Sequence, residues 1–97
     1  MDLTFEWDPK KASSNLAKHR VSFTEATSVF GDPLGVTIAD PDHSSDEDRY
    51  LTLGATGSGR TLIVAHTDRA SRIRLISARE LTPAERRSYE DASKDTR

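Results

Sequence analysis

The alternation of apolar and polar side chains at the start of the chain predicts a strand followed by a helix. Three apolar residues alternate with polar ones, as in a half-buried strand: Leu3, Phe5 and Trp7. Asp8 and Pro9 form an N-cap signal, from which a helix is expected to run to about Lys18. Four residues at helical spacing mark its inner face: Ala12, Asn15, Leu16 and His19.

Two further helices are predicted by capping boxes. Residues 22–25 open a short helix, which the Gly-Asp-Pro sequence at 31–33 ends. Residues 82–85 form a second capping box, with proline at the first helical position, and predict a helix through about Asp91. The chain is polar from there on, so residues 93–97 are expected to form a frayed tail.

Between these helices the chain is rich in β-branched and aliphatic residues. Four runs of this kind predict strands: Leu34–Ala39, Tyr50–Ala55, Thr61–Thr67 and Ile73–Ala78. An exposed acidic loop is expected over residues 40–46. The last three strands are joined by short links, Gly57-Ser58-Gly59 and Asp68-Arg69-Ala70-Ser71, which favour an antiparallel meander. The order β-α-α-β-β-β-β-α predicts an α+β fold, a small antiparallel sheet with two N-terminal helices and one C-terminal helix packed on it.

Composition excludes several classes of protein. A chain of 97 residues is expected to form a single domain, residues 1–97. It has no cysteine, and its three histidines include no His-x3-His pair, so we expect no disulfide, no metal site and no cofactor. No apolar run approaches the roughly 18 residues that span a bilayer, and no signal peptide is evident. The expected location is the cytoplasm, with no membrane partner.

The charge of the chain is unevenly distributed. The net charge is −2, but residues 60–97 hold nine Lys and Arg against six Asp and Glu. Between positions 60 and 79 a single acid, Asp68, stands among five arginines: Arg60, Arg69, Arg72, Arg74 and Arg79. Guanidinium groups suit forked contacts with phosphate, and the local field rather than the net charge would steer a polyanion.

Strand alternation sorts these arginines into two groups. Arg72 and Arg74 are expected on the face of Ala78, where they are either solvated or bound to phosphate. Arg79 is expected on the opposite face, with Leu75, as either a salt-bridged anchor or a phosphate ligand.

Other residues have equally open interpretations. Lys18 and His19 close the first helix, either as a simple C-cap or as a phosphate ligand beside a proton carrier. His66, among aliphatic neighbours, is expected to be a hydrogen-bonded core residue. Arg86 and Tyr89 either cover the sheet edge or bind phosphate and stack on a base.

The ordered set of motifs resembles the BrnT toxin family over residues 2 to about 91. Its first half consists of Phe5-Glu6-Trp7-Asp8, Lys11, Asn15, Lys18-His19, Val21-x-Phe23-x-Glu25-Ala26 and Asp32-Pro33. Its second half consists of Asp48-Arg49-Tyr50 with Gly54, Gly59-Arg60-x-Leu62, Thr67-x-Arg69, the strand Arg72 to Arg79 and Glu85-Arg86-Arg87-x-Tyr89-Glu90.

This resemblance implies a RelE-like fold and a metal-independent endoribonuclease that cleaves RNA and arrests translation. It also implies neutralisation by a BrnA-type ribbon-helix-helix antitoxin in a 2:2 heterotetramer, which would contact operator DNA only through the antitoxin. The alternative is a degenerate, non-catalytic homologue that acts as a regulatory or corepressor subunit of the antitoxin–DNA complex.

RNA cleavage without a metal needs a proton acceptor, a proton donor and cations around the phosphorane. The hypothesis assigns His19 as acid or base, Arg69 and Arg79 as charge stabilisers, and Tyr89 to stack on a base or orient the substrate. The cations expected to hold phosphates are Lys18, Arg49, Arg72, Arg74 and Arg86.

Overall fold

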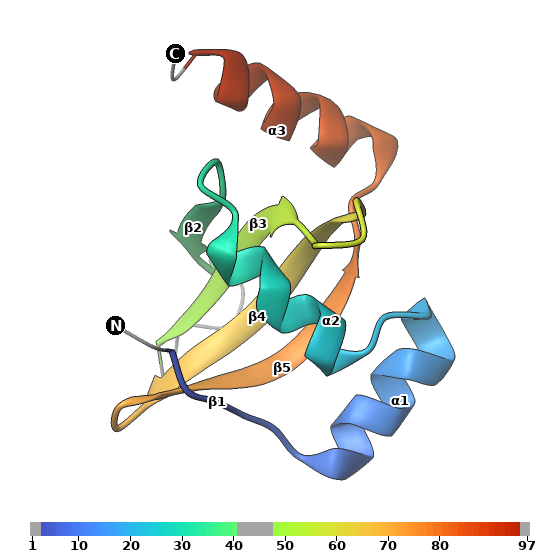
Figure 1. Cartoon of the computed structure of the whole chain (residues 1–97), viewed down its shortest axis with the longest axis vertical. Helices are drawn as coiled ribbons and strands as arrows, with labels where there is room; N and C mark the ends of the chain where they lie inside the picture. Colours follow the sequence, from blue (N-terminus) through green and yellow to red (C-terminus); the bar gives the residue numbers. More distant parts are fainter. Residues whose placement is uncertain (1–2, 41–47, 96–97) are drawn as a thin grey trace.

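A five-stranded sheet forms the frame of the domain. The computed structural model describes residues 3–40 and 48–95 (Figure 1). The strands are β1 (Phe5–Glu6), β2 (Val36–Ala39), β3 (Arg49–Ala55), β4 (Thr61–Arg69) and β5 (Arg72–Glu80). The helices are α1 (Pro9–His19), α2 (Phe23–Thr27), the 3-10 helix η1 (Ser28–Gly31) and α3 (Pro83–Asp95). The predicted acidic loop lies mostly outside the described residues.

The sheet is mixed, whereas the sequence predicted an antiparallel one. The order is β1-β5-β4-β3-β2, and the four long strands form the expected antiparallel meander. The difference is β1, which pairs in parallel with β5 through Phe5 opposite Ile73 and Glu6 opposite Arg74. Nothing local in a two-residue strand indicates a partner so far along the chain.

Several element boundaries also differ from the prediction. Strand β2 begins at Val36, because the Asp32 carboxylate accepts a hydrogen bond from the Leu34 amide and holds that residue in a turn. The link between β4 and β5 shrinks to Ala70 and Ser71, with Ala70 in the left-handed region at φ 56°. Helix α3 continues to Asp95, so the predicted frayed tail is helical over residues 93–95.

A β-bulge in β5 changes which side chains share a face. Val64 lies opposite Ala78, but His66 lies opposite Leu75, so Ile76 is the extra residue between the two pairs. Leu75 and Ala78 therefore both point into the core, where each is at most 1% exposed. The prediction that Arg79 shares a face with Leu75 was wrong, because the bulge places Arg79 on the opposite face, with Arg74.

The hydrophobic core lies on one side of the sheet, under α1, α2 and η1. Its buried members are Val21, Phe23, Ala26, Val29, Leu62, Val64, Leu75 and Ala78. No residue of α3 belongs to this cluster among those described, and Figure 1 shows α3 set apart from the other helices, at one end of the sheet. The C-terminal helix meets the sheet through side chains such as Glu85, which pairs with Arg79 of β5, rather than through this core cluster. The opposite face, called here the open face, carries Leu51, Leu53, Ile63, Ala65 and Arg79.

Asn15 is a buried polar residue that joins α1 to the edge of β5. Its amide nitrogen donates to the carbonyl oxygens of Ala78 at 2.8 Å and Val21 at 3.0 Å. Its amide oxygen accepts from the Ala78 N–H at 3.0 Å. Asn15 thus supplies the hydrogen bonds that another strand would supply, and it is only 5% exposed.

His66 is also buried, as the sequence predicted. Its Nε2 lies 2.7 Å from the Thr52 hydroxyl, which in turn lies 2.7 Å from the hydroxyl of Thr37 on β2. Its Nδ1 has no partner in the described part of the chain. Burial lowers the pKa of His66, although the negative charge of Asp68 partly opposes this. The folded protein therefore favours the neutral imidazole.

We expect Asn15→Ala to lower the free energy of unfolding by about 3 kcal/mol, because it leaves the Ala78 and Val21 backbone groups buried without partners. Urea denaturation followed by circular dichroism measures this loss. Ser14→Ala, an exposed neighbour on the same helix, is the matched control and should cost under about 0.5 kcal/mol. Equal losses in the two variants would contradict the role given to Asn15.

Acid should destabilise the fold through His66. Because its pKa in the folded state is below the ordinary value of 6.5, the unfolded chain takes up the proton more readily. The contribution of His66 to the free energy of unfolding is therefore complete above pH 6.5 and is lost as the pH falls below it. The slope of this loss is at most about 1.4 kcal/mol per pH unit. Urea titrations between pH 7.5 and 5 should show this slope in the unaltered chain and in His19→Gln, but a smaller one in His66→Gln. An unchanged slope in His66→Gln would refute the assignment.

Candidate nucleic-acid interface

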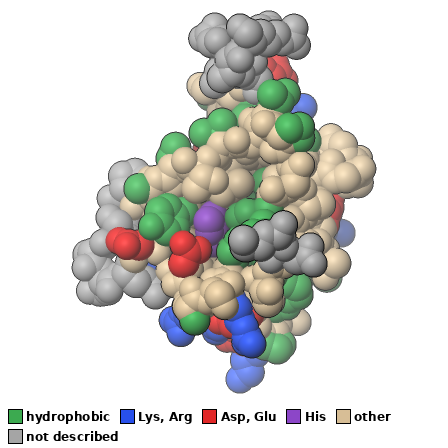
Figure 2. Space-filling model, turned by 60° about the vertical axis from the view of Figure 1, so that its left-hand side comes forward, with side chains coloured by type: hydrophobic (Ala, Val, Ile, Leu, Met, Phe, Trp, Pro, Cys, Tyr) green, Lys and Arg blue, Asp and Glu red, His purple; other side chains and the backbone are tan. Residues whose placement is uncertain are grey.

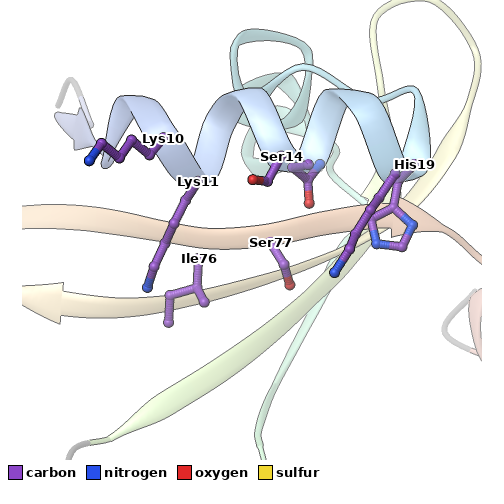
Figure 3. Close-up of a pocket in the computed structure, with 8 residues that line it drawn as sticks. Lys10, Lys11, Ser14, His19, Ile76 and Ser77 are labelled. Atoms are coloured by element: carbon purple, nitrogen blue, oxygen red, sulfur yellow. The ribbon is translucent and has the colours of Figure 1, made fainter.

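A cationic groove runs between α1 and β5. It has a volume of about 340 Å³ and is lined by Lys10, Lys11, Ser14, Asn15, Lys18, His19, Ile76 and Ser77. Figure 3 shows Lys11 reaching toward Ile76, and His19 at the other end of the helix, also directed toward the strands. This groove is called the α1–β5 groove below.

The sequence places these side chains together through two simple features. Lys11 and Lys18 are seven positions apart, so they lie on one face of the helix, two turns from each other. Asn15 lies between them and bonds to Ala78, which sets that face along the edge of β5. Beyond Arg74 this edge has no neighbouring strand in the described residues, because β1 pairs only with Ile73 and Arg74. The groove forms where the helix replaces the missing strand.

The end of α1 exposes both of its basic residues. Lys18 and His19 lie in the last turn, where a cation is favoured by the helix dipole. The helix ends at Arg20, which adopts a left-handed conformation (φ 58°) and donates its N–H to the Leu16 carbonyl oxygen. Because the backbone itself closes the helix, the side chains of Lys18 and His19 are not needed as a cap.

Arg72 and Arg74 are bound to a carboxylate rather than left for a ligand. Glu6 on β1 accepts a hydrogen bond from Arg74 at 2.9 Å and lies 3.5 Å from an Arg72 nitrogen. The hydrogen bond from Arg74 lowers the pKa of Glu6, and Arg72 adds to the effect. Glu6 therefore offsets part of the positive charge at this edge.

Arg79 forms a two-pronged salt bridge with Glu85 on α3. Its Nη1 and Nη2 donate to the two carboxylate oxygens at 2.8 and 3.0 Å. The pairing raises the pKa of Arg79 and lowers that of Glu85 to about 2. The geometry is that of a salt-bridged anchor, one of the two interpretations that the sequence left open. A phosphate would have to compete with Glu85 for this guanidinium.

A second contact ties α3 to the rest of the domain. The Tyr89 hydroxyl donates to Asp32 Oδ2 at 2.8 Å, and the same carboxylate accepts from the amides of Leu34 and Ala55. Burial favours the neutral acid, but the three hydrogen bonds outweigh it and lower the pKa of Asp32. Tyr89 is thus engaged at the β2 side of the sheet.

The predicted site residues do not form a single cluster. Lys18 and His19 come together in the α1–β5 groove, and Arg79 lies on the same strand and face as Ser77 in its wall. Arg69 lies opposite Arg72 at the β4–β5 turn, and Arg49 begins β3. Arg86 and Tyr89 are on α3 and do not line the groove. The predicted site residues did not include four further groove residues, Lys10, Lys11, Ser14 and Ser77, although the seven-residue spacing of Lys11 and Lys18 was a usable signal.

No metal centre or membrane span is found in the described residues. Across residues 3–40 and 48–95, no group of three or more His, Asp or Glu side chains is placed to hold a metal ion. None of the helices described is both long and apolar enough to cross a membrane.

Comparison with known proteins supports the resemblance seen in the sequence. Residues 7–85 match the family model described as the ribonuclease toxin BrnT of type II toxin-antitoxin systems. Among solved structures, the ribonuclease toxin BrnT of Brucella abortus has a similar fold, with a TM-score of 0.62 and 19% sequence identity. The alignment covers 84% of this chain and 99% of the Brucella chain. No curated protein matched. Because the family model spans most of the sequence, this chain belongs to the BrnT family of type II toxins.

Proposed function

We propose that the chain is a metal-independent endoribonuclease that arrests translation, and that the α1–β5 groove binds its RNA substrate. The observation that carries the proposal is the charge of this groove. Its walls contain Lys10, Lys11, Lys18 and His19 and no Asp or Glu among the described residues. A concave surface with cations and no carboxylate is suited to a polyanion in an otherwise acidic protein.

The dimensions of the groove suit a nucleic-acid backbone. Lys11 and Lys18 are separated by about 10 Å of helix rise, which leaves room for more than one phosphate. Ser14 and Ser77 offer neutral hydroxyl donors between them. These contacts go to phosphate and sugar, so the groove would position RNA without reading its sequence.

His19 is the residue proposed to transfer the proton. Imidazole is the side chain that exchanges protons near neutral pH, and His19 is exposed at the end of the groove. It would take the proton of the ribose 2′-hydroxyl, whose oxygen attacks the adjacent phosphorus and expels the 5′-oxygen. Lys18 would offset the charge that develops on the phosphorane, and water would protonate the leaving oxygen.

The remaining predicted residues would contact RNA outside the α1–β5 groove in this proposal. Arg69, together with Arg49 and Arg86, would hold phosphates beyond the groove. Arg72 and Arg74 would do so only in part, because Glu6 already binds them. Arg79 would stabilise the transition state only after exchanging Glu85 for a phosphate, and Tyr89 would stack on a base near α3.

The family places the chain in a toxin-antitoxin pair, so it has an antitoxin partner. We propose a BrnA-type ribbon-helix-helix antitoxin in a 2:2 heterotetramer, acting in the cytoplasm and touching operator DNA only through the antitoxin. The alternative of a non-catalytic regulatory subunit has one observation in its favour. Three of the predicted RNA-binding or catalytic arginines, Arg72, Arg74 and Arg79, are paired with carboxylates.

The first test is cleavage of a mixed-sequence RNA by the purified chain, free of antitoxin, in EDTA. Cleavage should persist in the chelator, and His19→Gln should slow it on the order of 100-fold, as expected for a lost general acid or base. Lys18→Gln should weaken RNA binding. Arg87→Gln, an exposed cation on α3 away from the groove, is the matched control and should change neither.

Three results would count against this proposal. Cleavage that stops in EDTA would exclude metal independence, and full activity of His19→Gln would exclude its catalytic role. If the chain leaves both free RNA and translating ribosomes intact, the regulatory alternative is correct.

Removing the carboxylate that holds Arg79 should strengthen RNA binding. Glu85→Gln keeps an oxygen that accepts from the Thr82 amide but removes the charge that pairs with the Arg79 guanidinium. The affinity for RNA should therefore rise a few-fold. The salt dependence of RNA binding should steepen by about one phosphate contact. Filter binding over a range of salt concentrations measures both effects. Glu90→Gln makes the same change of charge at an exposed position of α3, and an equal gain there would mean that Arg79 takes no part.

A further inference from the structure

A second groove, between β2, β3 and α3, has a different chemistry. The sheet contributes Val36, Ile38 and Leu53, and α3 contributes Ala84, Ser88 and Tyr89. Its volume is about 350 Å³, similar to that of the α1–β5 groove, but its lining is mainly aliphatic. Val36 is 40% exposed and Ile38 is 48% exposed. This surface is called the β2 groove.

The aliphatic side chains are exposed because of strand order. Strand β2 is at the end of the sheet, and its alternate residues Val36 and Ile38 lie on the open face, opposite Leu53 and Leu51 of β3. None of the three N-terminal helices covers this face. Figure 2 brings forward the left-hand side of Figure 1, where β2 lies; most Lys and Arg side chains in view gather at the lower end, and hydrophobic side chains lie higher up.

The backbone of β2 is also open to a partner. The Asp40 amide donates to the Arg49 carbonyl oxygen, so Asp40 and its alternate neighbours Ile38 and Val36 direct their backbone groups toward β3. Thr37 and Ala39 therefore direct their N–H and C=O groups away from the sheet. An edge of this kind is able to accept one more strand.

The charge around the β2 groove selects the kind of strand that fits. Its described lining includes Glu85, which is paired with Arg79, and no Lys or Arg. Asp32, whose carboxylate accepts the Tyr89 hydroxyl, adds a negative charge beside it. Residues 21–40, the described part of the segment that carries β2, contain three Asp and Glu and no Lys or Arg. The described lining offers RNA no cation, and pairing of two β2 edges would bring the Asp32 carboxylates of two copies closer together.

We infer that the β2 groove binds an extended, basic segment of a partner protein, which adds a strand to the outer edge of β2. Aliphatic side chains at alternate positions of that segment pack on Val36 and Ile38, and Lys or Arg side chains face the acidic surroundings. The backbone of the segment bonds to Thr37 and Ala39. The inference is independent of the proposed ribonuclease activity, because it uses the other edge of the sheet.

A synthetic peptide tests this directly on the intact chain. The probe is a fluorescein-labelled ten-residue peptide of alternating valine and lysine, followed by fluorescence polarisation. It should bind at least tenfold tighter than a valine–glutamate peptide, and tighter than a peptide with five valines followed by five lysines. The double substitution Val36→Thr with Ile38→Thr keeps residues that favour strands and should weaken binding about tenfold.

Leu3→Thr is the matched control, because Leu3 is 54% exposed beside the other edge strand of the sheet and should leave binding unchanged. Nuclear magnetic resonance should show the largest amide shifts at Thr37 and Ala39. Equal binding of the block peptide, or no loss in the double variant, would overturn the inference. So would a dimer of the chain alone that the double variant dissociates, because the occupant would then be a second copy.

Discussion

The side-chain amide of Asn15 is the contact on which the arrangement of this domain depends. Strand β5 lies nearly at the edge of the sheet, because β1 covers only its first residues. Asn15 completes the hydrogen bonding at Ala78 and so fixes a helix where a strand would otherwise lie. The same contact sets Lys11 and Lys18 along the groove that Ile76 and Ser77 also line. Stability and the position of the candidate site therefore have one common cause.

The two edges of the sheet have opposite electrostatic character. Cations border the β5 edge, whereas the segment that carries β2 has acids only. Carboxylates from elsewhere in the chain, Glu6 and Glu85, reach the β5 arginines and offset part of their charge. This distribution reconciles a net charge of −2 with a groove suited to a polyanion. In the two proposals above, RNA and a basic partner segment bind separate surfaces of opposite charge.

Local signals in the sequence were enough for most elements and not for their tertiary partners. The capping boxes at Ser22 and Thr82 and the turn at Gly57 to Gly59 predicted their elements correctly, because each depends on neighbouring residues. The parallel pairing of β1 depends on residues nearly seventy positions apart in the chain. The partners of Arg74 and Arg79 are also carboxylates that only the folded chain brings near. The basic pair Lys18 and His19 was predicted from its position at a helix end, whereas the helical period would have been needed to add Lys11, which lines the same groove.

The bulge at Ile76 has a consequence for comparing relatives of this protein. The alternation of core and surface side chains along β5 changes phase at the bulge. A strand with one residue fewer would therefore exchange core and surface positions over its last four residues. A relative that lacks the extra residue would need an arginine one place earlier in its sequence to present the same guanidinium on the open face. An ungapped alignment is therefore a poor guide to which residues of β5 are equivalent in two relatives. The face of the sheet on which each side chain lies is a better guide.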